Sequence, residues 1–433
     1  MDTTKLFEAA LGLLPPWHVA ATEFRPGTPT TRGQLDVRID FARGGTLPCP
    51  TCGVACKAYD TTDQRWRHLN FFEHETYLHA RVPRVECTTH GVGTVTVPWA
   101  RAGSGFTLLF EAYVLALAAA MPMAALARLL GENDTRLWRI VQWHVADARR
   151  QVDMRAVTSV VVDETSQAKR HRYVSLFLEP KAPAPGPGPT AARVLFVTAG
   201  RAHTAFRAFV ADLRAHQGDP AQITDVCMDM SPAYQRGAAE TLPQAAVTFD
   251  RFHVMQVVGK ALDDVRRREH KTRPELKRSR YLWLTNPAHL SATQQAALDQ
   301  LSATNLRTAQ AYQMRLNLQA LWERQTPRAA ARYLARWCAW VERTAARPTD
   351  PAHPWVLEAM HRTAQTLRTH APGILNYFRR HLTSGVIESV NGLAQAARAR
   401  ARGYRNVETF QTIIYLLAGR LRFDLPNLAT HTR

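Results

Sequence analysis

Two aspartates in the chain directly follow short apolar runs of the kind that form buried strands. Asp163 comes after the run 160–162, and Asp229 comes after the run 226–228. A carboxylate at a strand end can project into a cleft, and two such ends can hold a hard cation between them, which oxygen ligands suit. Phosphoryl transfer on nucleic acid typically uses two such ions, ~3.5–4 Å apart. The pattern predicts a divalent-metal site, although aspartate also ends many strands as a turn residue.

A third acidic residue, Glu388, lies in the first turns of a predicted helix for which Ser384 can serve as the N-cap. At about 100° per residue, Asn391, Arg398 and Arg402 fall within about 80° of Glu388 on the helix wheel. The stripe would place a metal ligand at one end and DNA-contacting side chains along the rest. An ordinary amphipathic helix with solvated arginines has the same pattern.

Four other side chains have the spacing of a different kind of metal site. Cys49 and Cys52 enclose two residues, Cys87 and His90 enclose two more, and 34 residues separate the pairs. Two such knuckles can deliver four ligands to one tetrahedral zinc ion, and a closed site of this kind predicts structural Zn²⁺. Two unrelated thiol pairs are the alternative. Nearby rivals to His90 as the fourth ligand are Cys56, His68, His74 and His79.

The composition indicates a polyanionic partner. The 433 residues include 55 Lys plus Arg against 36 Asp plus Glu, a net charge of +19. Each phosphate that such a chain neutralises releases condensed counterions. The most apolar stretch, residues 106–130, is interrupted by Glu111, Pro122 and Arg128, so no membrane span is expected. Six cysteines without a signal peptide indicate a reducing cytoplasm.

Residues 104–150 have the spacing of a helix-turn-helix, with turns at Met121-Pro122 and Gly131. The third helix is expected to start near Asp134. Arg136 and Arg139 then lie in its first turns, where a recognition helix presents donors to DNA. A plain three-helix bundle is the alternative.

From residue 157 the apolar residues occur in short runs suited to buried strands. The runs are 160–162, 173–178, 194–197, 226–228 and 246–249. Helical stretches interleave after the third run, which predicts a mixed sheet covered by helices. The Pro/Gly insert 181–189 is expected to form a long hairpin loop. The predicted fold is therefore multidomain α/β, and the predicted segments are 1–45 (rich in strands), 46–95 (zinc module), 104–150 (helix-turn-helix), 155–255 (first part of the catalytic core), 256–382 (all-helical insertion) and 383–425 (last part of the core, with the Glu388 helix).

Four motifs in this order resemble bacterial insertion-sequence transposases of the ISL-three family. They are VVVDETS around Asp163, MDMSPAY around Asp229, FDRFHV at 249–254 and SGVIESVNGLAQAARARARGYRNVETF at 384–410. The combination is far more specific than any one motif, and the likeness covers most of the chain. It implies an RNase H-like core interrupted by a helical insertion, with Asp163, Asp229 and Glu388 as a DDE triad.

The resemblance also implies a mechanism and cofactors. Two Mg²⁺ or Mn²⁺ ions at the triad would activate water to free a 3′-hydroxyl at the element end, and that hydroxyl would attack target DNA. His253 in the FDRFHV motif would assist near the scissile phosphate, whereas the residues alone equally favour a structural contact between Asp250 and His253. Two features depart from the family: His90 replaces a common cysteine, and the insert 181–189 is an elaboration.

The expected partners are double-stranded DNA, as element ends and target, and further copies of the chain in a homodimer or larger assembly. The expected location is the nucleoid of a bacterial cytoplasm. Three alternatives stay open: a non-catalytic zinc-containing DNA-binding regulator, a structure-specific nuclease, and a covalent recombinase that uses Tyr234 as its nucleophile.

Overall fold

Two units, each with its own sheet, make up the chain. One comprises Met1–Ala148 with Arg422–Arg433, and the other comprises Arg149–Leu421. The structure is a computed structural model, and it describes residues 3–42, 44–168, 172–182, 191–200, 203–346, 356–383 and 385–426. Ser384 and residues 183–189 of the Pro/Gly insert therefore lie outside the described residues.

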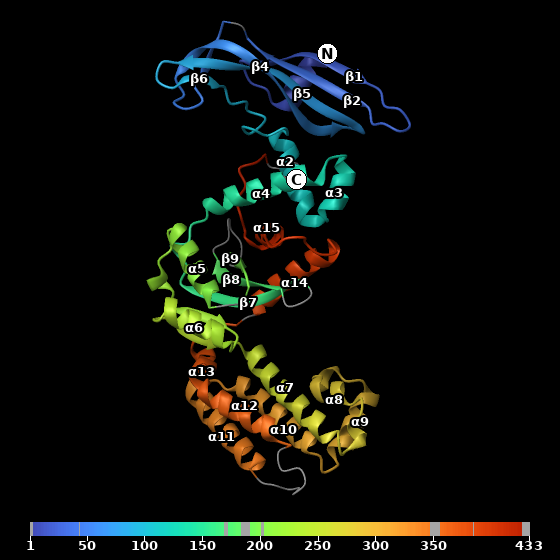
Figure 1. The fold of residues 1–433 in the computed structure, drawn as a ribbon, viewed down its shortest axis with the longest axis vertical. Coiled ribbons are helices and arrows are strands. Elements are labelled where there is room, and N and C mark those ends of the chain that lie inside the picture. The colour runs from blue at the N-terminus through green and yellow to red at the C-terminus, as the bar shows by residue number, and fades with distance from the viewer. Residues whose placement is uncertain are drawn as a thin grey trace. The chain divides into compact units, whose positions relative to one another are not determined.

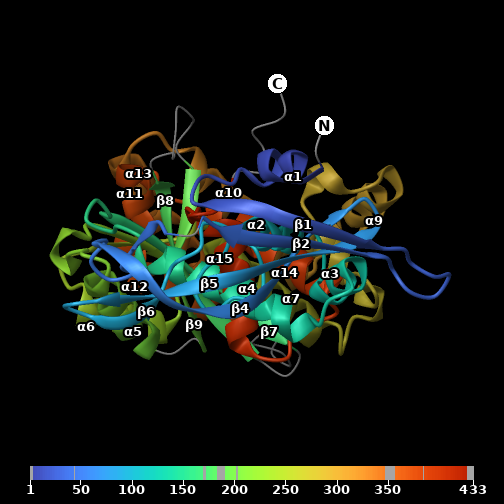
Figure 2. The same ribbon diagram turned by 90° about the horizontal axis from the view of Figure 1, so that it is seen from above.

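The first unit opens with a helix and a sheet (Figures 1 and 2). Its elements are α1 (Thr3–Leu11), β1 (Trp17–Arg25), β2 (Gln34–Phe41), β3 (Thr46–Pro48), β4 (Ala55–Phe71), β5 (His74–Cys87) and β6 (Gly91–Thr94). The strand order is β1-β2-β5-β4-β3, and β6 pairs with β5. β2 and β5 are parallel, whereas the other neighbours are antiparallel.

This sheet joins two segments that the sequence predicts separately, because β2 from segment 1–45 pairs directly with β5 from segment 46–95. The chain also begins with a helix, whereas alternation at residues 35–41 predicts only strand. Helix α1 is short and has no fully buried residue. Its half-buried Phe7 and Leu11 pack against a core that contains Trp17, Trp66 and Trp99.

The predicted helix-turn-helix forms three helices in the same unit, α2 (Leu108–Ala120), α3 (Met123–Leu130) and α4 (Asp134–Arg150). Thr107 caps α2 by accepting a hydrogen bond from the backbone N–H of Phe110. Pro122 precedes α3, and Gly131 ends it with φ of +70°, a left-handed conformation that glycine adopts without strain. The two turns therefore occur where proline and glycine predict them.

The second unit is built on a five-stranded mixed sheet, of which Figure 1 labels β7, β8 and β9. Its strands are β7 (Ser159–Ala168), β8 (Arg172–Ala182), β9 (Ala191–Ala199), β10 (Asp225–Met228) and β11 (Ala246–Phe249), in the order β11-β10-β7-β8-β9. β10 is parallel to β7 and to β11, while β7, β8 and β9 are antiparallel. Each strand coincides with one of the predicted apolar runs.

Helices cover both faces of this sheet, because successive side chains of a strand point to opposite faces. Val160, Val162 and Phe177 pack in one core with residues of α5 (Thr204–Ala215) and α6 (Pro232–Thr241). Val161 and Cys227 pack in a second core with residues of α14 (Gly385–Arg400) and α15 (Val407–Ala418). A short 3₁₀ turn, η1 (Pro220–Gln222), leads into β10.

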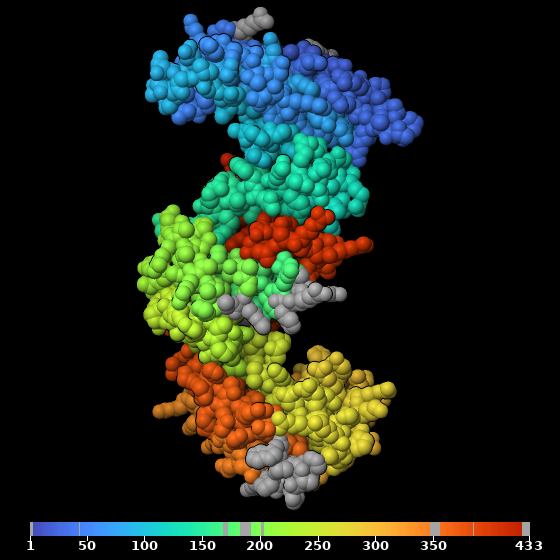
Figure 3. Space-filling view, in the orientation of Figure 1, coloured from blue at the N-terminus to red at the C-terminus, as the bar shows by residue number. Residues whose placement is uncertain are grey.

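A helical segment lies between β11 and α14 in the sequence. It contains α7 (Arg251–Glu269), η2 (Pro274–Leu276), α8 (Arg280–Leu284), η3 (Pro287–His289), α9 (Ala292–Ser302), α10 (Arg307–Gln319), η4 (Ala320–Glu323), α11 (Pro327–Ala345), α12 (Glu358–Thr369) and α13 (Ala371–Arg380). In Figure 3 its yellow and orange residues pack side by side. None of the helices in the described ranges is long and apolar enough to cross a membrane.

Helix α7 connects the sheet to this segment and is anchored at both ends. At its start, Asp250 accepts hydrogen bonds from the backbone N–H groups of Phe252 (2.9 Å) and His253 (3.1 Å). At its end, the buried Glu269 accepts from the backbone N–H groups of Arg307 (2.8 Å) and Thr308 (2.7 Å) at the start of α10. Because Asp250 caps it, α7 begins at residue 251, before the predicted boundary at 256.

Candidate functional site

The structure brings the four predicted zinc ligands together in the first unit. The ligand atoms of Cys49, Cys52, Cys87 and His90 all lie within 4.8 Å of one another. Cys52 Sγ is 3.8 Å from Cys87 Sγ, and Cys87 Sγ is 3.6 Å from His90 Nδ1. These separations suit a tetrahedral ion bound at 2.0–2.3 Å by nitrogen and sulfur.

Backbone hydrogen bonds favour the thiolate forms of two of these cysteines. Backbone N–H groups of Thr89 and His90 lower the pKa of Cys87 to about 7, and those of Cys52 and Thr51 lower the pKa of Cys49. A thiolate, rather than a thiol, is the form that ligates a metal.

The rival fourth ligands contact other groups. Cys56 donates to the carbonyl of Val54, His68 lies 2.8 Å from the hydroxyl of Thr107, and His79 lies 2.6 Å from Asp36. The ring of His74 packs edge-to-face on Phe24, with centroids 4.4 Å apart. Among the described residues, the cluster therefore forms with His90.

The two predicted arginines of the helix-turn-helix differ in their surroundings. Arg136 Nη1 lies 2.6 Å from Glu132 and its guanidinium stacks on Phe106, whereas Arg139 is exposed on the same helix. An ion pair with a half-exposed arginine costs little to break, so a DNA phosphate can compete for Arg136. DNA contact by Arg136 and Arg139 stays a prediction.

In the second unit, strand register places Asp163 beside Asp229. β10 pairs in parallel with β7 so that Val226 lies opposite Val160 and Cys227 lies opposite Val161. Two residues further along, the same register sets Asp229 opposite Asp163. Alternation turns both carboxylates to the face that Val161 and Cys227 share with α14. Neighbouring strands are about 4.8 Å apart, so Asp163 on β7 lies beside the end of β10, which Asp229 follows, and the charge of Asp229 acts on Asp163.

Burial raises the pKa of Asp163 from its usual value near 3.8 to about 6, and the negative charges of Asp229 and Glu164 add to the rise. The side-chain amide of Asn391 on α14 donates to Asp163 Oδ2 at 2.9 Å. Asp229 Oδ1 accepts from the backbone N–H of Ser231 at 2.9 Å, which fixes the turn after β10. The carboxylate of Asp163 thus lies in a site where its negative charge is poorly compensated.

His253 joins this site from the first turn of α7. Its Nε2 is 4.0 Å from Asp163 Oδ1, and its Nδ1 is 3.3 Å from Asp250 Oδ2. The Asp250 carboxylate raises the pKa of His253. The sequence leaves a catalytic and a structural interpretation open for His253; in the structure Asp250 caps the helix while the other edge of the imidazole faces Asp163.

Helix α14 carries the third predicted acid along β7. Glu388 is exposed and precedes Asn391 by three residues, nearly one helical turn. Further along the helix, Gln395 donates to Thr165 Oγ1 at 2.7 Å, and Arg398 donates to the carbonyl of Ser166 at 2.9 Å. The contact of Asn391 with Asp163 places the preceding turn of α14, which carries Glu388, nearer to Asp163 than to Ser166. Among the described residues, however, Asp163, Asp229 and Glu388 do not form a compact ligand group of the kind that the four zinc ligands form.

These contacts change the interpretation of the predicted DNA-contacting stripe. Asn391 and Arg398 bind β7 rather than lying free along the helix, so both position the sheet and α14. Arg402 is exposed beyond the end of α14 in a left-handed conformation, with φ of +57°. Sequence analysis also missed Gln395, although its spacing of four from Asn391 marks the same helix face.

Comparisons with known protein families agree with this arrangement. Residues 160–414 match a family model described as a transposase. Residues 95–145 match the helix-turn-helix domain of transposase family ISL3, and residues 46–90 match the zinc-finger of transposases IS204, IS1001, IS1096 and IS1165. The three models define the class of this protein as a DNA transposase with a zinc ribbon. Since the first model spans more than half of the chain, the chain belongs to the ISL3 transposase family.

Curated relatives extend the likeness over the full length. The chain is 26% identical over 462 aligned residues to the transposase for insertion sequence element IS1557 of Mycobacterium tuberculosis, covering 100% of this chain and 99% of that protein. It is 27% identical over 372 residues to the transposase for insertion sequence element IS1001 of Bordetella parapertussis, covering 84% and 86% of the two chains. Both relatives are insertion-sequence transposases.

Proposed function

We propose that Asp163, Asp229 and Glu388 form the catalytic triad of this transposase on an RNase H-like core. The strand order β11-β10-β7-β8-β9, with β10 and β11 parallel to β7, supports that core. The helical segment from about 256 to 382 would be an insertion between β11 and α14. The remaining predicted boundaries, 46–95 for the zinc module, 104–150 for the helix-turn-helix and 155–255 with 383–425 for the core, belong to the same proposal.

The single observation that carries the proposal is the parallel register of β7 and β10, which supports a position for Asp229, directly after β10, beside Asp163 on β7. The donor set fits Mg²⁺ or Mn²⁺, because all the donors are carboxylate oxygens and Asp163 has too little positive charge around it. Bound there, a pair of divalent ions would activate the attacking oxygen and stabilise the leaving oxygen.

The chain's own side chains would prepare that reaction. The amide of Asn391 holds one oxygen of Asp163, which leaves the other oxygen directed toward His253. Asp250 holds the Nδ1 edge of His253 and supports its protonated form. The Nε2–H of His253 can then donate to a non-bridging oxygen of the scissile phosphate. This hydrogen bond would be the auxiliary role that the sequence predicts for His253.

The rival covalent scheme finds no support at Tyr234. This side chain is 1% exposed, and its hydroxyl lies 2.7 Å from the hydroxyl of Ser175. Burial raises the pKa of Tyr234 well above its usual value. A buried, neutral phenol cannot reach a DNA phosphate, so direct displacement without a protein–DNA intermediate is the proposed route.

The first unit would deliver this core to DNA. We propose that Zn²⁺ bound by Cys49, Cys52, Cys87 and His90 is structural, and that Arg136 and Arg139 on α4, with Arg402 beyond α14, contact double-stranded DNA of the element ends or target. Joining two element ends requires at least two copies of the chain, so the proposed active form is a homodimer or larger assembly.

Cleavage of labelled DNA carrying the ends of the element, with Mg²⁺, tests the triad. Asp163→Asn, Asp229→Asn and Glu388→Gln should each lower the cleavage rate on the order of a thousandfold, since a metal ion supplies several kcal/mol of stabilisation in the transition state. Glu164→Gln is the matched control, because alternation turns Glu164 to the opposite face of β7.

Two outcomes would overturn the proposal. Full cleavage by Glu388→Gln would remove the third ligand from the site. Undiminished DNA binding without any Mg²⁺-dependent nicking by the wild-type protein would indicate a DNA-binding regulator instead.

A further inference from the structure

A pocket lies along α7 directly beyond the proposed catalytic residues. It has a volume of about 850 Å³ and is lined by residues of α7, α8 and α10 and by Asn286. Phe252, which lines the pocket, stacks edge-to-face on His253 with ring centroids 5.7 Å apart. Because His253 Nε2 is 4.0 Å from Asp163 Oδ1, the pocket and the carboxylates are connected through two adjacent side chains of one helix turn.

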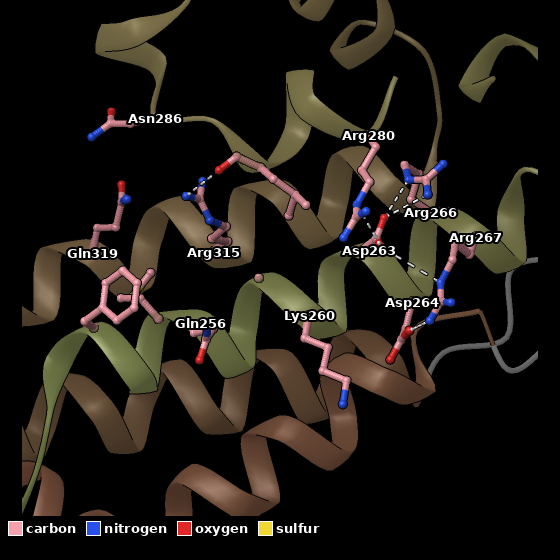
Figure 4. Close-up of a pocket in the computed structure, with 14 residues that line it drawn as sticks. Gln256, Lys260, Asp263, Asp264, Arg266, Arg267, Arg280, Asn286, Arg315 and Gln319 are labelled. Carbon is pink, nitrogen blue, oxygen red and sulfur yellow. Dashed lines mark hydrogen bonds and ion pairs between the residues drawn. The ribbon is translucent and has the colours of Figure 1, made fainter. Parts of the chain in front are cut away.

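The two ends of this pocket differ in chemistry. Ion pairs join Asp263 to Arg266 at 2.8 Å and to Arg280 at 3.3 Å, and Figure 4 shows this cluster at one end. Gln256, Asn286 and Gln319 lie toward the other end. Phe252 precedes Gln256 by one helical turn, so the aromatic ring belongs to the amide-bearing end.

Arg267, which also lines the pocket, pairs with Asp264 and lies 3.9 Å from Asp263, whereas Lys260 and Arg315 form no ion pair within the described part of the chain. Lys260 is exposed on α7. Arg315 on α10 donates from Nη2 to the carbonyl of Leu284 at 3.2 Å, and its buried Nη1 has no hydrogen-bond partner in the described part of the chain. The guanidinium of Arg315 is therefore held at the pocket wall by a backbone contact, and its positive charge adds to that of Lys260.

The aromatic ring is unusually available. The side chain of Phe252 is 56% exposed although it is large and apolar. The floor of the pocket is also open, because Gly259 in the middle of α7 has no side chain to fill it. Glycine at such a position weakens a helix, so it has a cost in stability. A Cβ added at Gly259 would meet no heavy atom closer than Leu284 Cδ2 at 3.9 Å, so close packing does not require glycine there.

Exposed aromatic rings, amides and unpaired cations are the groups that bind unpaired nucleotides: bases stack on the ring, amides hydrogen-bond base edges, and cations hold phosphates. Double-stranded DNA cannot use the ring, since its bases are stacked on one another. We propose that this pocket binds a single-stranded DNA segment next to the cleavage site, with a base on Phe252 and phosphate on Lys260, near the positive charge of Arg315. This inference rests on the proposed function for the position of the cleavage site, and it names the form of the substrate there.

Binding of a fluorescein-labelled oligo(dT) of about a dozen nucleotides tests the proposal, with a random-sequence duplex of the same length as the reference probe. The full-length protein is used in buffer without Mg²⁺, and affinity is measured by fluorescence anisotropy. Phe252→Ala should weaken oligo(dT) binding about tenfold, because stacking on an aromatic ring contributes that much per base. Phe252→Trp should restore it, and duplex affinity should not change in either variant.

Matched controls separate the pocket from general charge. Phe72→Ala removes another phenylalanine, 79% exposed and in the first unit, and Lys271→Gln removes an exposed lysine outside the pocket. Neither should alter oligo(dT) binding, whereas Lys260→Gln should weaken it several-fold. Gly259→Leu should weaken it by filling the floor, while Gly259→Ala should not.

Equal oligo(dT) affinities for the wild type and Phe252→Ala would overturn the proposal, as would an equal loss of oligo(dT) and duplex binding. Asp163→Asn distinguishes this inference from the proposed catalytic function. It should bind oligo(dT) like the wild type, because the pocket does not need the catalytic carboxylates. Normal cleavage by a Phe252→Ala protein that also binds oligo(dT) normally would refute the pocket alone.

Discussion

The thiol cluster and the carboxylate site stabilise their anions in opposite ways. Backbone N–H groups lower the pKa of Cys87 to about 7, whereas burial beside other acids raises the pKa of Asp163 to about 6. The first site holds its negative charge with donors from the chain itself. The second leaves a carboxylate short of compensation, which favours a cation. The comparison teaches that the turns of the thiol cluster already stabilise its negative charge. At the proposed catalytic site, the charge of Asp163 is left to be stabilised by a cation.

The largest expected effect concerns the thiol cluster. Cys87→Ser should release zinc and destabilise the first unit by more than about 4 kcal/mol, because loss of a structural metal belongs to the most damaging substitutions. Zinc content measured by mass spectrometry and the thermal unfolding curve check this expectation. Cys56→Ser is the matched control and should keep its zinc.

His90→Cys sharpens the same point. A cysteine at this position should retain zinc, because a thiolate ligates the ion at least as well as imidazole. If Cys56→Ser loses zinc while His90→Ala keeps it, the cluster of four would be assigned to the wrong residues.

A smaller effect on stability is expected from the raised pKa of Asp163. Its folded pKa lies above the unfolded value near 3.8, so the group favours folding below pH 4, and that contribution is lost as pH rises through about 6. Asp163→Asn should therefore stabilise the second unit at pH 8 in Mg²⁺-free buffer, by up to ~3 kcal/mol.

Denaturant unfolding of wild type and Asp163→Asn at pH 8 and pH 4 measures that difference. The gain should shrink toward pH 4, where the wild-type carboxyl is also neutral. A wild type more stable than the variant at pH 8 would show that Asp163 is compensated after all, and the contrast between the two sites would disappear.

The smallest predicted effect concerns the amide that holds Asp163. Asn391→Ala removes the 2.9 Å hydrogen bond to Asp163 Oδ2, which is a bond to a charged group and contributes about 1.5–3 kcal/mol. Cleavage should slow by about ten- to a hundredfold.

The acidic limb of the pH–rate profile should also move to higher pH, because loss of the donor disfavours the ionised carboxyl. Gln395→Ala, which breaks only contacts to Thr165 and Ser166, is the control and should not move the profile. A rate loss in Asn391→Ala without a shift in the profile would indicate a role in packing only.

The sequence predicts residue types and faces better than it predicts partners. The five apolar runs of the second unit all form strands, and proline and glycine mark the turns of the helix-turn-helix. The spacing of the cysteine pairs predicts a cluster that the structure assembles, since each pair is local. Asp163 and Asp229 are 66 residues apart, so their proximity depends on strand register, which alternation alone does not specify.

The interpretation of α14 shows the limit most clearly. The helix wheel groups Glu388, Asn391 and Arg398 on one face, but a long polar side chain on that face can reach either DNA or a neighbouring strand. Asn391 and Arg398 reach β7. Helix α1 is not predicted, because nine residues are too short a segment for helical periodicity to stand out from the strand pattern that follows.

Helix α7 links the sheet of the second unit directly to the helical segment. Its 19 residues form a rod of about 28 Å, held by Asp250 at the sheet and by Glu269 at the start of α10. Because a helix of this length is stiff, a displacement of one end also displaces the other. If DNA binds the proposed pocket on α7, a shift of this helix would also move the imidazole of His253 in its first turn, and would so couple binding there to the proposed catalytic site.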